Sequence, residues 1–193
     1  MIGRGASYRL TLRRMVTGIV LAAGAGTRFG GPKLLAADGA WARAAVAALH
    51  GGGCTDVLVV QGAARLVVPG ARTVVAHDWS QGLSRSVAAG LRAASDDCVL
   101  TLVDTPDVDA ACVARVLAAG RAAAEGAARA VYGGRPGHPV YLAQRHHERL
   151  VTALVAAAGP AADRGVWPHL DAGVDIECAD LATGRDVDTL EAQ

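Results

Sequence analysis

Short apolar runs alternate with helical patterns along this chain, and the alternation constrains the fold more than any other feature of the sequence. Strands are expected at 16–21, 56–60, 73–76, 98–103, 129–132, 140–142 and 174–177, and helices at 41–50, 83–94, 110–124 and 145–158. Several of these runs are continuously apolar, which is typical of strands buried on both faces. The pattern predicts an α/β fold: a single Rossmann-like domain with a mostly parallel sheet and helices on both faces.

The remaining segments are predicted from their turn residues and from their length. Residues 133–139, Gly-Gly-Arg-Pro-Gly-His-Pro, indicate a turn-rich loop, and residues 163–170 indicate a short helix. A length of 193 residues suits one domain, which we expect at 15–193. Residues 1–14 carry four arginines and no acid, and they lack the apolar stretch of a secretory signal. A disordered extension is expected there.

Composition excludes several classes of function. The formal net charge is +1, which gives no sign of a nucleic-acid-binding face. Charged residues and glycines interrupt every apolar run before it reaches the length of a membrane span. The sequence therefore predicts a soluble, cytoplasmic protein that engages neither nucleic acid nor a membrane.

The segment after the first expected strand is rich in glycine and reads Leu21-Ala-Ala-Gly-Ala-Gly-Thr-Arg28-Phe-Gly-Gly-Pro-Lys33. Glycines at such positions let backbone N–H groups approach a phosphate without obstruction by a Cβ atom. It is not a Walker A loop, because Pro32 precedes Lys33 and no Ser or Thr follows it. A dinucleotide fingerprint is also disfavoured, since the second strand ends on Gln61 and not on an acid.

The two cations of this loop, Arg28 and Lys33, distinguish it from an ordinary turn. Lys33 is the only lysine among 19 basic residues. A compact ammonium on a flexible stem can follow a phosphate as charge moves during transfer, whereas arginine offers a fixed fork. We predict that Lys33 binds phosphate; the alternative is a solvated surface lysine.

Carboxylates at two places are candidate metal ligands. Asp104 directly follows the run 98–103, at the end of a strand where open α/β sheets bind ligands. A carboxylate there suits Mg²⁺, which takes one or two protein carboxylates besides phosphate oxygens and waters. Alternation puts Asp186 and Asp188 on one face of an extended segment, and Asp188 is favoured as the second ligand. The alternative for Asp104 or Asp107 is to cap the next helix, which Asp107 fits better.

The glycine-rich loop resembles the opening motif of molybdenum-cofactor nucleotidyltransferases, Leu-Ala-Ala-Gly-x-Gly-x-Arg-x-Gly-x-Pro-Lys, and especially their cytidylyltransferase branch. Further resemblances follow in the family's order: Asp78-Trp-Ser-Gln-Gly-Leu-Ser-Arg-Ser86, Val103-Asp-Thr-Pro-Asp107, Gly137-His-Pro139, Asp163-Arg-Gly165 and Asp186-Val-Asp-Thr189. Together they cover nearly everything after Met15. The chain departs from the family at 189–193, which read Thr-Leu-Glu-Ala-Gln where Thr-Pro-Glu-Asp is usual.

The resemblance implies a nucleoside triphosphate and Mg²⁺ at this loop. The residues implied to bind the nucleotide there are Leu21, Ala22, Ala23, Gly24, Gly26, Arg28 and Lys33. The resemblance further implies that Gln61 and Asp78 lie beside the base and the ribose, and that His138 faces the second substrate. Ser84 begins a helix whose N-terminus suits an anion, and it can equally cap that helix. His138 can equally be an ordinary turn residue.

These expectations combine into one reaction, in which CMP from CTP is transferred to the phosphate of a molybdopterin-type acceptor and pyrophosphate leaves. Arg28, Lys33 and Asp104 are the expected catalytic residues. A phosphate monoester is largely ionised at neutral pH, so no catalytic base is required. A molybdenum hydroxylase is the implied recipient of the product. Two alternatives stay open: an NAD(P)H-dependent oxidoreductase, a name that some relatives carry, and a non-catalytic module that delivers nucleotide or cofactor.

Overall fold

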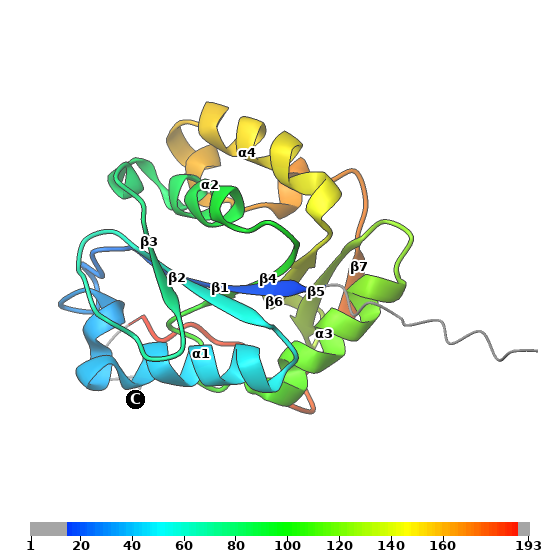
Figure 1. Cartoon of the computed structure of the whole chain (residues 1–193), viewed down its shortest axis with the longest axis horizontal. Coiled ribbons are helices and arrows are strands. Elements are labelled where there is room, and N and C mark those ends of the chain that lie inside the picture. Colours follow the sequence, from blue (N-terminus) through cyan, green and yellow to red (C-terminus); the bar gives the residue numbers. More distant parts are fainter. Residues whose placement is uncertain (1–14, 189–193) are drawn as a thin grey trace, which may run out of the picture.

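Seven strands form one sheet in the computed structural model, which describes residues 15–188 (Figure 1). The strands are β1 (Val16–Ala22), β2 (Asp56–Gln61), β3 (Arg72–Val75), β4 (Asp97–Leu102), β5 (Ala127–Tyr132), β6 (Arg135–Leu142) and β7 (Val174–Glu177). The helices are α1 (Ala40–Gly51), α2 (Leu83–Ala93), α3 (Ala110–Ala122) and α4 (His147–Ala156). The extension predicted at 1–14 lies outside the described residues, as do residues 189–193.

The strands follow the order β3-β2-β1-β4-β6-β5-β7. β6 runs antiparallel to both of its neighbours, β4 and β5, whereas every other pair in the described sheet is parallel. The predicted mostly parallel sheet is therefore confirmed, with β7 at one edge as its alternating sequence indicates.

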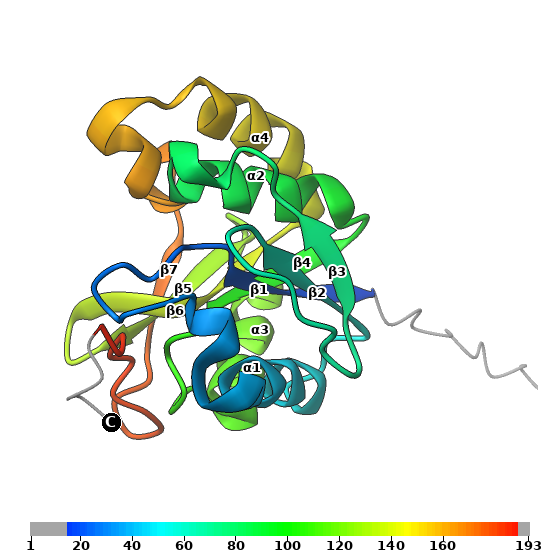
Figure 2. The same ribbon diagram turned by 90° about the vertical axis from the view of Figure 1, so that its left-hand side faces the viewer.

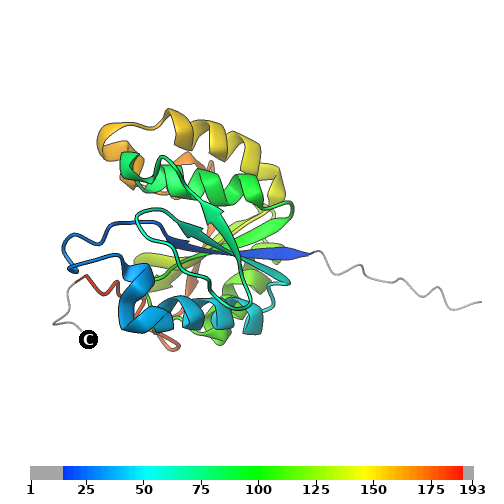
Figure 3. The same ribbon diagram turned by 60° about the vertical axis from the view of Figure 1, so that its left-hand side comes forward.

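Helices cover both faces of the sheet (Figures 1 and 3). α1 and α3 pack together on one face, and α2 and α4 pack together on the other. The α/β class is confirmed, and each of the four predicted helices is present. None of the helices between residues 15 and 188 combines the length and the apolar composition that a membrane span needs.

Burial on both faces explains why β1 is apolar along its whole length. All seven of its residues are buried. Val20 faces the core cluster under α1 and α3, whereas Ile19 and Leu21 face the cluster under α2 and α4. Gly18 leaves room for Leu49 of α1, because a Cβ atom there would lie 2.9 Å from that side chain. The strand is thus fixed at the centre of the sheet, and the loop that follows it starts from a rigid base.

The largest departure from the sequence prediction is at 133–139, where most of the predicted loop is strand. β6 begins at Arg135 and pairs antiparallel with β5, so that Tyr132 lies opposite Arg135. Gly133 and Gly134 form the whole turn, with φ values of 60° and 79°. A two-residue hairpin turn of this kind requires positive φ at both positions. The prediction was wrong because the glycine and prolines that follow lie within the strand.

Residues 163–170 also differ from the prediction of one short helix. Two 3-10 turns occupy this stretch of the chain, η4 (Gly159–Asp163) and η5 (Trp167–His169). Gly165 between them has a φ of 63°, a left-handed conformation that interrupts a right-handed helix.

Candidate active site

The loop that follows β1 is a folded turn held by its own backbone. Gly26 has a φ of 60°, and its carbonyl oxygen accepts hydrogen bonds from Phe29 N at 2.9 Å and Gly31 N at 3.1 Å. A Cβ atom on Gly26 would lie 1.9 Å from the carbonyl oxygen of Gly31, so only glycine fits. The buried Phe29 ring lies 5.4 Å from the Trp41 ring in α1, measured between centroids. The loop therefore presents its two cations from a fixed base.

Lys33 lies between two carboxylates. Its Nζ is 2.6 Å from Asp104 Oδ2 and 2.9 Å from Asp188 Oδ1, and only 15% of its side chain is exposed. Burial disfavours the charged form of Lys33, yet the hydrogen bonds to Asp104 and Asp188 outweigh burial and raise its pKa. The alternative of a solvated surface lysine is therefore wrong.

The two carboxylates come from segments that are far apart in the sequence. Asp104 follows the C-terminal end of β4, whereas Asp188 belongs to residues 183–188, which we call the C-terminal segment. This segment lies beside the loop after β1 (Figures 2 and 3). Val187 N donates a hydrogen bond to the carbonyl oxygen of Asp104 at 2.9 Å. The hydrogen bond from Lys33 lowers the pKa of Asp188, which therefore stays ionised.

Arg28 and Asp186 add charges to the same cluster. The Arg28 side chain is 82% exposed, and its Nη2 lies 3.8 Å from Asp188 Oδ2. Burial raises the pKa of Asp186, and the negative charges of Asp104 and Asp188 add to that rise. Both acids of the C-terminal segment thus face the place where Asp104 lies.

A cavity of about 560 Å³ lies over this cluster, and we call it the loop cavity. Its lining contains nine residues that the sequence predicts: Leu21, Ala22, Ala23, Gly24, Gly26, Arg28, Lys33, Asp104 and Asp188. It also contains Trp79, Ser80, Ser86, Asp163 and Asp186. The first three of these belong to the segment 78–86, within two positions of a predicted residue, and only the fold shows which side chains turn inward.

Two predicted nucleotide-binding residues lie outside the lining of the loop cavity because the local fold uses them differently. Gln61 is fully buried, and its amide group exchanges hydrogen bonds of 2.6 and 3.0 Å with the backbone of Leu66. These hydrogen bonds hold the connection between β2 and β3 against the end of β2. Asp78 precedes the 3-10 turn η2 (Trp79–Gln81), and Trp79 and Ser80 line the cavity in its place.

Ser84 is a third predicted residue outside this lining, and it does not cap α2. The capping position is Gly82, and the buried Ser84 hydroxyl has no hydrogen-bond partner in the described part of the chain. Leu83 N instead donates to Asp163 Oδ1 at 3.3 Å. A carboxylate of the protein therefore lies at the helix N-terminus where an anion was expected, and Ser86, two residues after Ser84, lines the cavity.

Asp107 is not the cap of α3. Asp109 fills that position, and its Oδ1 accepts hydrogen bonds from Ala111 N at 2.9 Å and Cys112 N at 3.0 Å. The carboxylate of Asp107 contacts Thr183 of the C-terminal segment instead. The alternative that Asp107 is a helix cap is therefore wrong, and Asp107 joins the two segments that carry Asp104 and Asp188.

A second cavity, of about 610 Å³, adjoins the first, and we call it the hairpin cavity because the β5–β6 hairpin forms one of its walls. The two cavities share six lining residues: Leu21, Leu83, Leu102, Asp163, Asp186 and Asp188. Further lining residues of the hairpin cavity are Arg129, Arg135, His138, Arg164, Trp167 and Arg185. A molecule in one cavity can therefore meet a molecule in the other beside the acids of the C-terminal segment.

The hairpin cavity is lined by four arginines that differ in their contacts. Arg129 forms an ion pair with Asp175 at 2.7 Å, and its Cζ lies 4.1 Å from the centroid of the Trp167 ring. Arg135, Arg164 and Arg185 form no ion pair with any residue between 15 and 188. Four arginines against three acids in the lining (Asp163, Asp186 and Asp188) leave a small excess of positive charge, which favours an anionic ligand.

His138 lines the hairpin cavity, as the resemblance implies for the second substrate. It lies within β6, so the alternative of an ordinary turn residue is wrong. Burial lowers its pKa to about 4 against the opposing charge of Asp104, so the imidazole is neutral at pH 7. Tyr132 Oη donates a hydrogen bond to the carbonyl oxygen of His138 at 2.5 Å, which fixes this part of the strand.

Asp104 and Asp188 fit a divalent cation, because both carboxylates already converge on one cation, the Lys33 ammonium. Among residues 15–188, no three His, Cys, Asp or Glu side chains gather closely enough to hold a metal by themselves. Two carboxylates, with phosphate oxygens and waters as the remaining ligands, are a common arrangement for Mg²⁺. A metal at this position would therefore be shared between the protein and a bound phosphate group.

Known proteins resemble this chain in both sequence and fold. Nicotine blue oxidoreductase of Paenarthrobacter nicotinovorans is 36% identical over 193 residues, which cover 91% of this chain and 93% of that protein. The crystal structure of the Mycobacterium tuberculosis Rv0371c homologue from Mycobacterium sp. strain JC1 matches with a TM-score of 0.72 and 28% identity, over 92% of each chain. Rv0371c of Mycobacterium tuberculosis H37Rv in complex with manganese matches at 23% identity with a TM-score of 0.68, over 92% of this chain and 95% of that one.

A family model also covers most of the chain. Residues 18–175 match the MobA-like NTP transferase domain, a span that runs from β1 into β7. It includes the whole glycine-rich loop, Asp104 and His138. The chain therefore belongs to the family of MobA-like NTP transferase domains, which are nucleotidyltransferases.

Proposed function

We propose that this protein transfers CMP from CTP to the phosphate of a molybdopterin-type acceptor, with Mg²⁺ and with release of pyrophosphate. A molybdenum hydroxylase is the proposed recipient of the product, and the cytoplasm is the proposed location. The observation that carries the reaction type is the junction of the two cavities at Asp186 and Asp188, beside which Lys33 of the loop cavity contacts Asp104 and Asp188. A two-substrate transfer needs both substrates to meet at one charged point, and the junction provides it.

The loop cavity suits the triphosphate. Its glycines let the backbone approach phosphate oxygens, and Arg28 and Lys33 supply positive charge for the β- and γ-phosphates. The exposed Arg28 side chain has the freedom to close over a bound nucleotide. Arg28 and Lys33 would then neutralise the charge that develops on the leaving pyrophosphate, which is the main source of catalysis in phosphoryl transfers.

Asp104 and Asp188 are the proposed ligands of Mg²⁺. The metal, when bound, supplies positive charge at the α-phosphate and lowers the cost of the developing negative charge. Lys33 contacts both carboxylates in the structure, and its flexible side chain would turn toward the phosphates if a metal took its place between Asp104 and Asp188. The manganese complex of Rv0371c supports a divalent metal in this fold.

The hairpin cavity suits the acceptor. Arg135, Arg164 and Arg185 favour a molecule that carries phosphate, since all three lack an ion pair within residues 15–188. An oxygen of the acceptor phosphate attacks the α-phosphorus of CTP, the bond from that phosphorus to the β-phosphate bridging oxygen breaks, and pyrophosphate leaves with the electron pair. The attacking oxygen is already deprotonated at neutral pH. The neutral His138 therefore needs no role as a base and orients the acceptor.

A second candidate function is NAD(P)H-dependent reduction, which is favoured by the name of the relative at 36% identity. The local structure speaks against it, because β2 ends on Gln61 and its side chain is engaged with Leu66. An acid that receives the ribose hydroxyls of a dinucleotide is expected at that position. Oxidation of NADH or NADPH with nicotine blue, followed by absorbance, would establish this candidate. A non-catalytic delivery protein would bind nucleotide and release no pyrophosphate.

A calorimetric screen of CTP, GTP, ATP and UTP with Mg²⁺ tests the proposed function at its first step. We expect CTP to bind most tightly, and to bind much more weakly when Mg²⁺ is withheld. Asp104→Asn keeps the shape of the side chain and removes its charge, so it should abolish the dependence on the metal. Equal binding of all four nucleotides with and without Mg²⁺ would reject the proposal.

A further inference from the structure

The C-terminal segment carries Asp186 and Asp188, yet residues 183–188 belong to no strand or helix. Its position therefore depends on individual contacts. Asp107 Oδ2 accepts hydrogen bonds from both Thr183 N and Thr183 Oγ1, each at 2.6 Å. At the other end of the segment, Val187 N donates to the carbonyl oxygen of Asp104 at 2.9 Å. Both anchors lie on the short connection that leaves β4.

Thr183 extends the constraint along the segment. Its Oγ1 also accepts a hydrogen bond of 3.4 Å from Arg185 N, the residue before Asp186. Gly184 lies against the ring of Tyr132, since a Cβ atom there would approach that ring to 2.0 Å. A single oxygen of Asp107 thus determines the direction in which the chain leaves Thr183 toward the acids.

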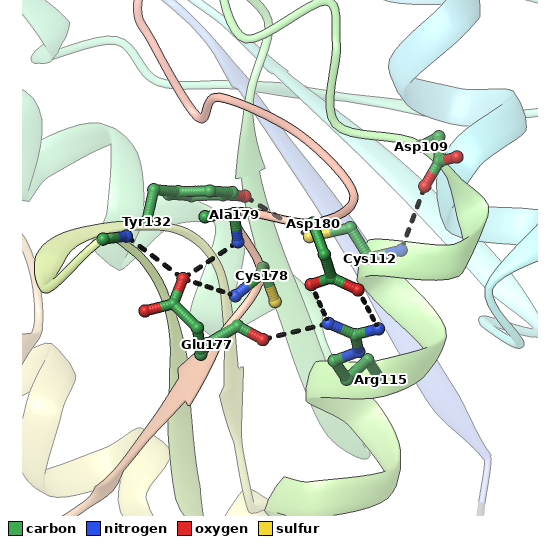
Figure 4. A network of polar contacts seen from close by, with 9 residues as sticks. Asp109, Cys112, Arg115, Tyr132, Glu177, Cys178, Ala179 and Asp180 are labelled. Carbon is green, nitrogen blue, oxygen red and sulfur yellow. Dashed lines mark hydrogen bonds and ion pairs between the residues drawn. The ribbon is translucent and has the colours of Figure 1, made fainter.

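The stretch before the segment is fixed separately, as Figure 4 shows. Glu177 Oε1 accepts hydrogen bonds from Gly133 N, Cys178 N and Ala179 N at 2.9 to 3.1 Å. Arg115 forms an ion pair with Asp180. The chain is therefore held firmly as far as residue 180, and the contact with Asp107 is the next side-chain anchor along the described chain.

We propose that Asp107 is a positioning residue for the metal site, because through Thr183 it sets the position of Asp188 relative to Asp104. The inference rests on the proposed function, in which Asp104 and Asp188 hold a divalent cation. Asp107 lines neither cavity, so it is not placed to contact a substrate or the metal directly. Outer groups that orient metal ligands typically change metal affinity by about 10–100-fold when they are removed.

The test is a calorimetric titration of MnCl₂ into the protein at saturating CTP, for the unchanged chain, four single variants and one double variant. Asp107→Ala should weaken Mn²⁺ binding by about tenfold, the lower end of the effect of an outer-shell group. Asp107→Asn should bind nearly as well as the unchanged chain, because its amide oxygen can accept both hydrogen bonds from Thr183. Asp107 is exposed, so neither change should prevent folding.

Asp109→Ala is the matched control, because Asp109 lies on the same connection and also accepts two backbone hydrogen bonds, of which Figure 4 draws the one from Cys112. Its loss should lower thermal stability through the α3 cap and leave Mn²⁺ affinity unchanged. Thr183→Val keeps the bond from Thr183 N but loses both bonds of the hydroxyl, so it should weaken Mn²⁺ binding alone and do so less in the Asp107→Ala background, where the bond to Asp107 is already gone.

Two outcomes separate this inference from the proposed function. Failure of the unchanged chain to bind Mn²⁺ with any triphosphate would reject the proposed function itself. Binding in the unchanged chain with equal affinity in Asp107→Ala, or an equal loss in Asp107→Asn and Asp107→Ala, would overturn the positioning role.

Discussion

The two adjoining cavities are built in opposite ways. The loop cavity owes seven of its lining residues to one continuous stretch, 21–33, and is rich in acids that are partly neutralised by Arg28 and Lys33. The hairpin cavity draws its arginines from four separate places in the chain. Three of these arginines form no ion pair within the described residues. One cavity is thus a local motif and the other is a product of the tertiary fold. Changes at residues that line only one cavity should leave ligand binding in the other intact.

Among these changes, Lys33→Ala in the loop cavity should reduce activity most. We expect kcat to fall by about 100-fold or more, the scale of one lost electrostatic stabiliser. Steady-state rates with CTP, Mg²⁺ and acceptor measure this loss, while binding of inorganic phosphate in the hairpin cavity should not change. If the variant retains the full kcat, Lys33 takes no part in catalysis.

The choice between CTP and GTP tests whether residues of the loop cavity alone select the base. The family's guanylyltransferase branch typically has glycine where this chain has Ala23, whose methyl group lines the cavity. Discrimination by such steric contacts is worth about 1–3 kcal/mol, so CTP should exceed GTP by about 10- to 100-fold in kcat/KM. Competition between the two triphosphates measures the ratio, and Ala23→Gly should reduce it. A preference for GTP in the unchanged chain would reverse the branch assignment.

Single arginine changes should affect only the hairpin cavity. Arg135→Ala, Arg164→Ala or Arg185→Ala should each raise the KM for the acceptor by about tenfold, as expected for one lost charged hydrogen bond. The affinity for CTP, measured by calorimetry, should stay the same. A parallel loss of CTP affinity in all three would mean that the two cavities act as one site.

The smallest expected effect concerns acid stability. His138 has a pKa near 4 in the folded protein and about 6.5 when unfolded, so the unfolded chain binds more protons between these values. This contribution to stability is complete above about pH 6.5 and is lost as the pH falls toward 4. His138→Gln should therefore lose less Tm between pH 7 and pH 4.5 than the unchanged chain. An identical loss in both proteins would show that His138 titrates normally.

The sequence predicted most of the fold because periodicity and burial agree in β1, β2 and β4. It failed at 133–139, where two glycines suffice for the turn and the following prolines lie in a strand. Local signals identify a turn, but they do not say where the strand resumes.

The site residues likewise divide into those that the local sequence predicts and those that only the tertiary fold brings together. Those of the glycine-rich loop were predictable because they are contiguous and lie at the end of a buried strand. Gln61 and Ser84 have suitable chemistry, but the packing of nearby segments turns both side chains away from the cavities. Arg135, Arg164 and Arg185 carry no spacing that marks them as a set, because three distant segments bring them together. The contact between Asp107 and Thr183 likewise spans 76 positions.

The central claim is that the two cavities meet to transfer a nucleotidyl group, and pyrophosphate release measures it most directly. The unchanged chain is incubated with CTP labelled at the α-phosphate, Mg²⁺ and molybdopterin, and both pyrophosphate and labelled acceptor are quantified. We predict equal amounts of the two products, with none from Asp104→Asn. Absence of pyrophosphate with all four triphosphates, or oxidation of NAD(P)H by the same protein, would contradict the account.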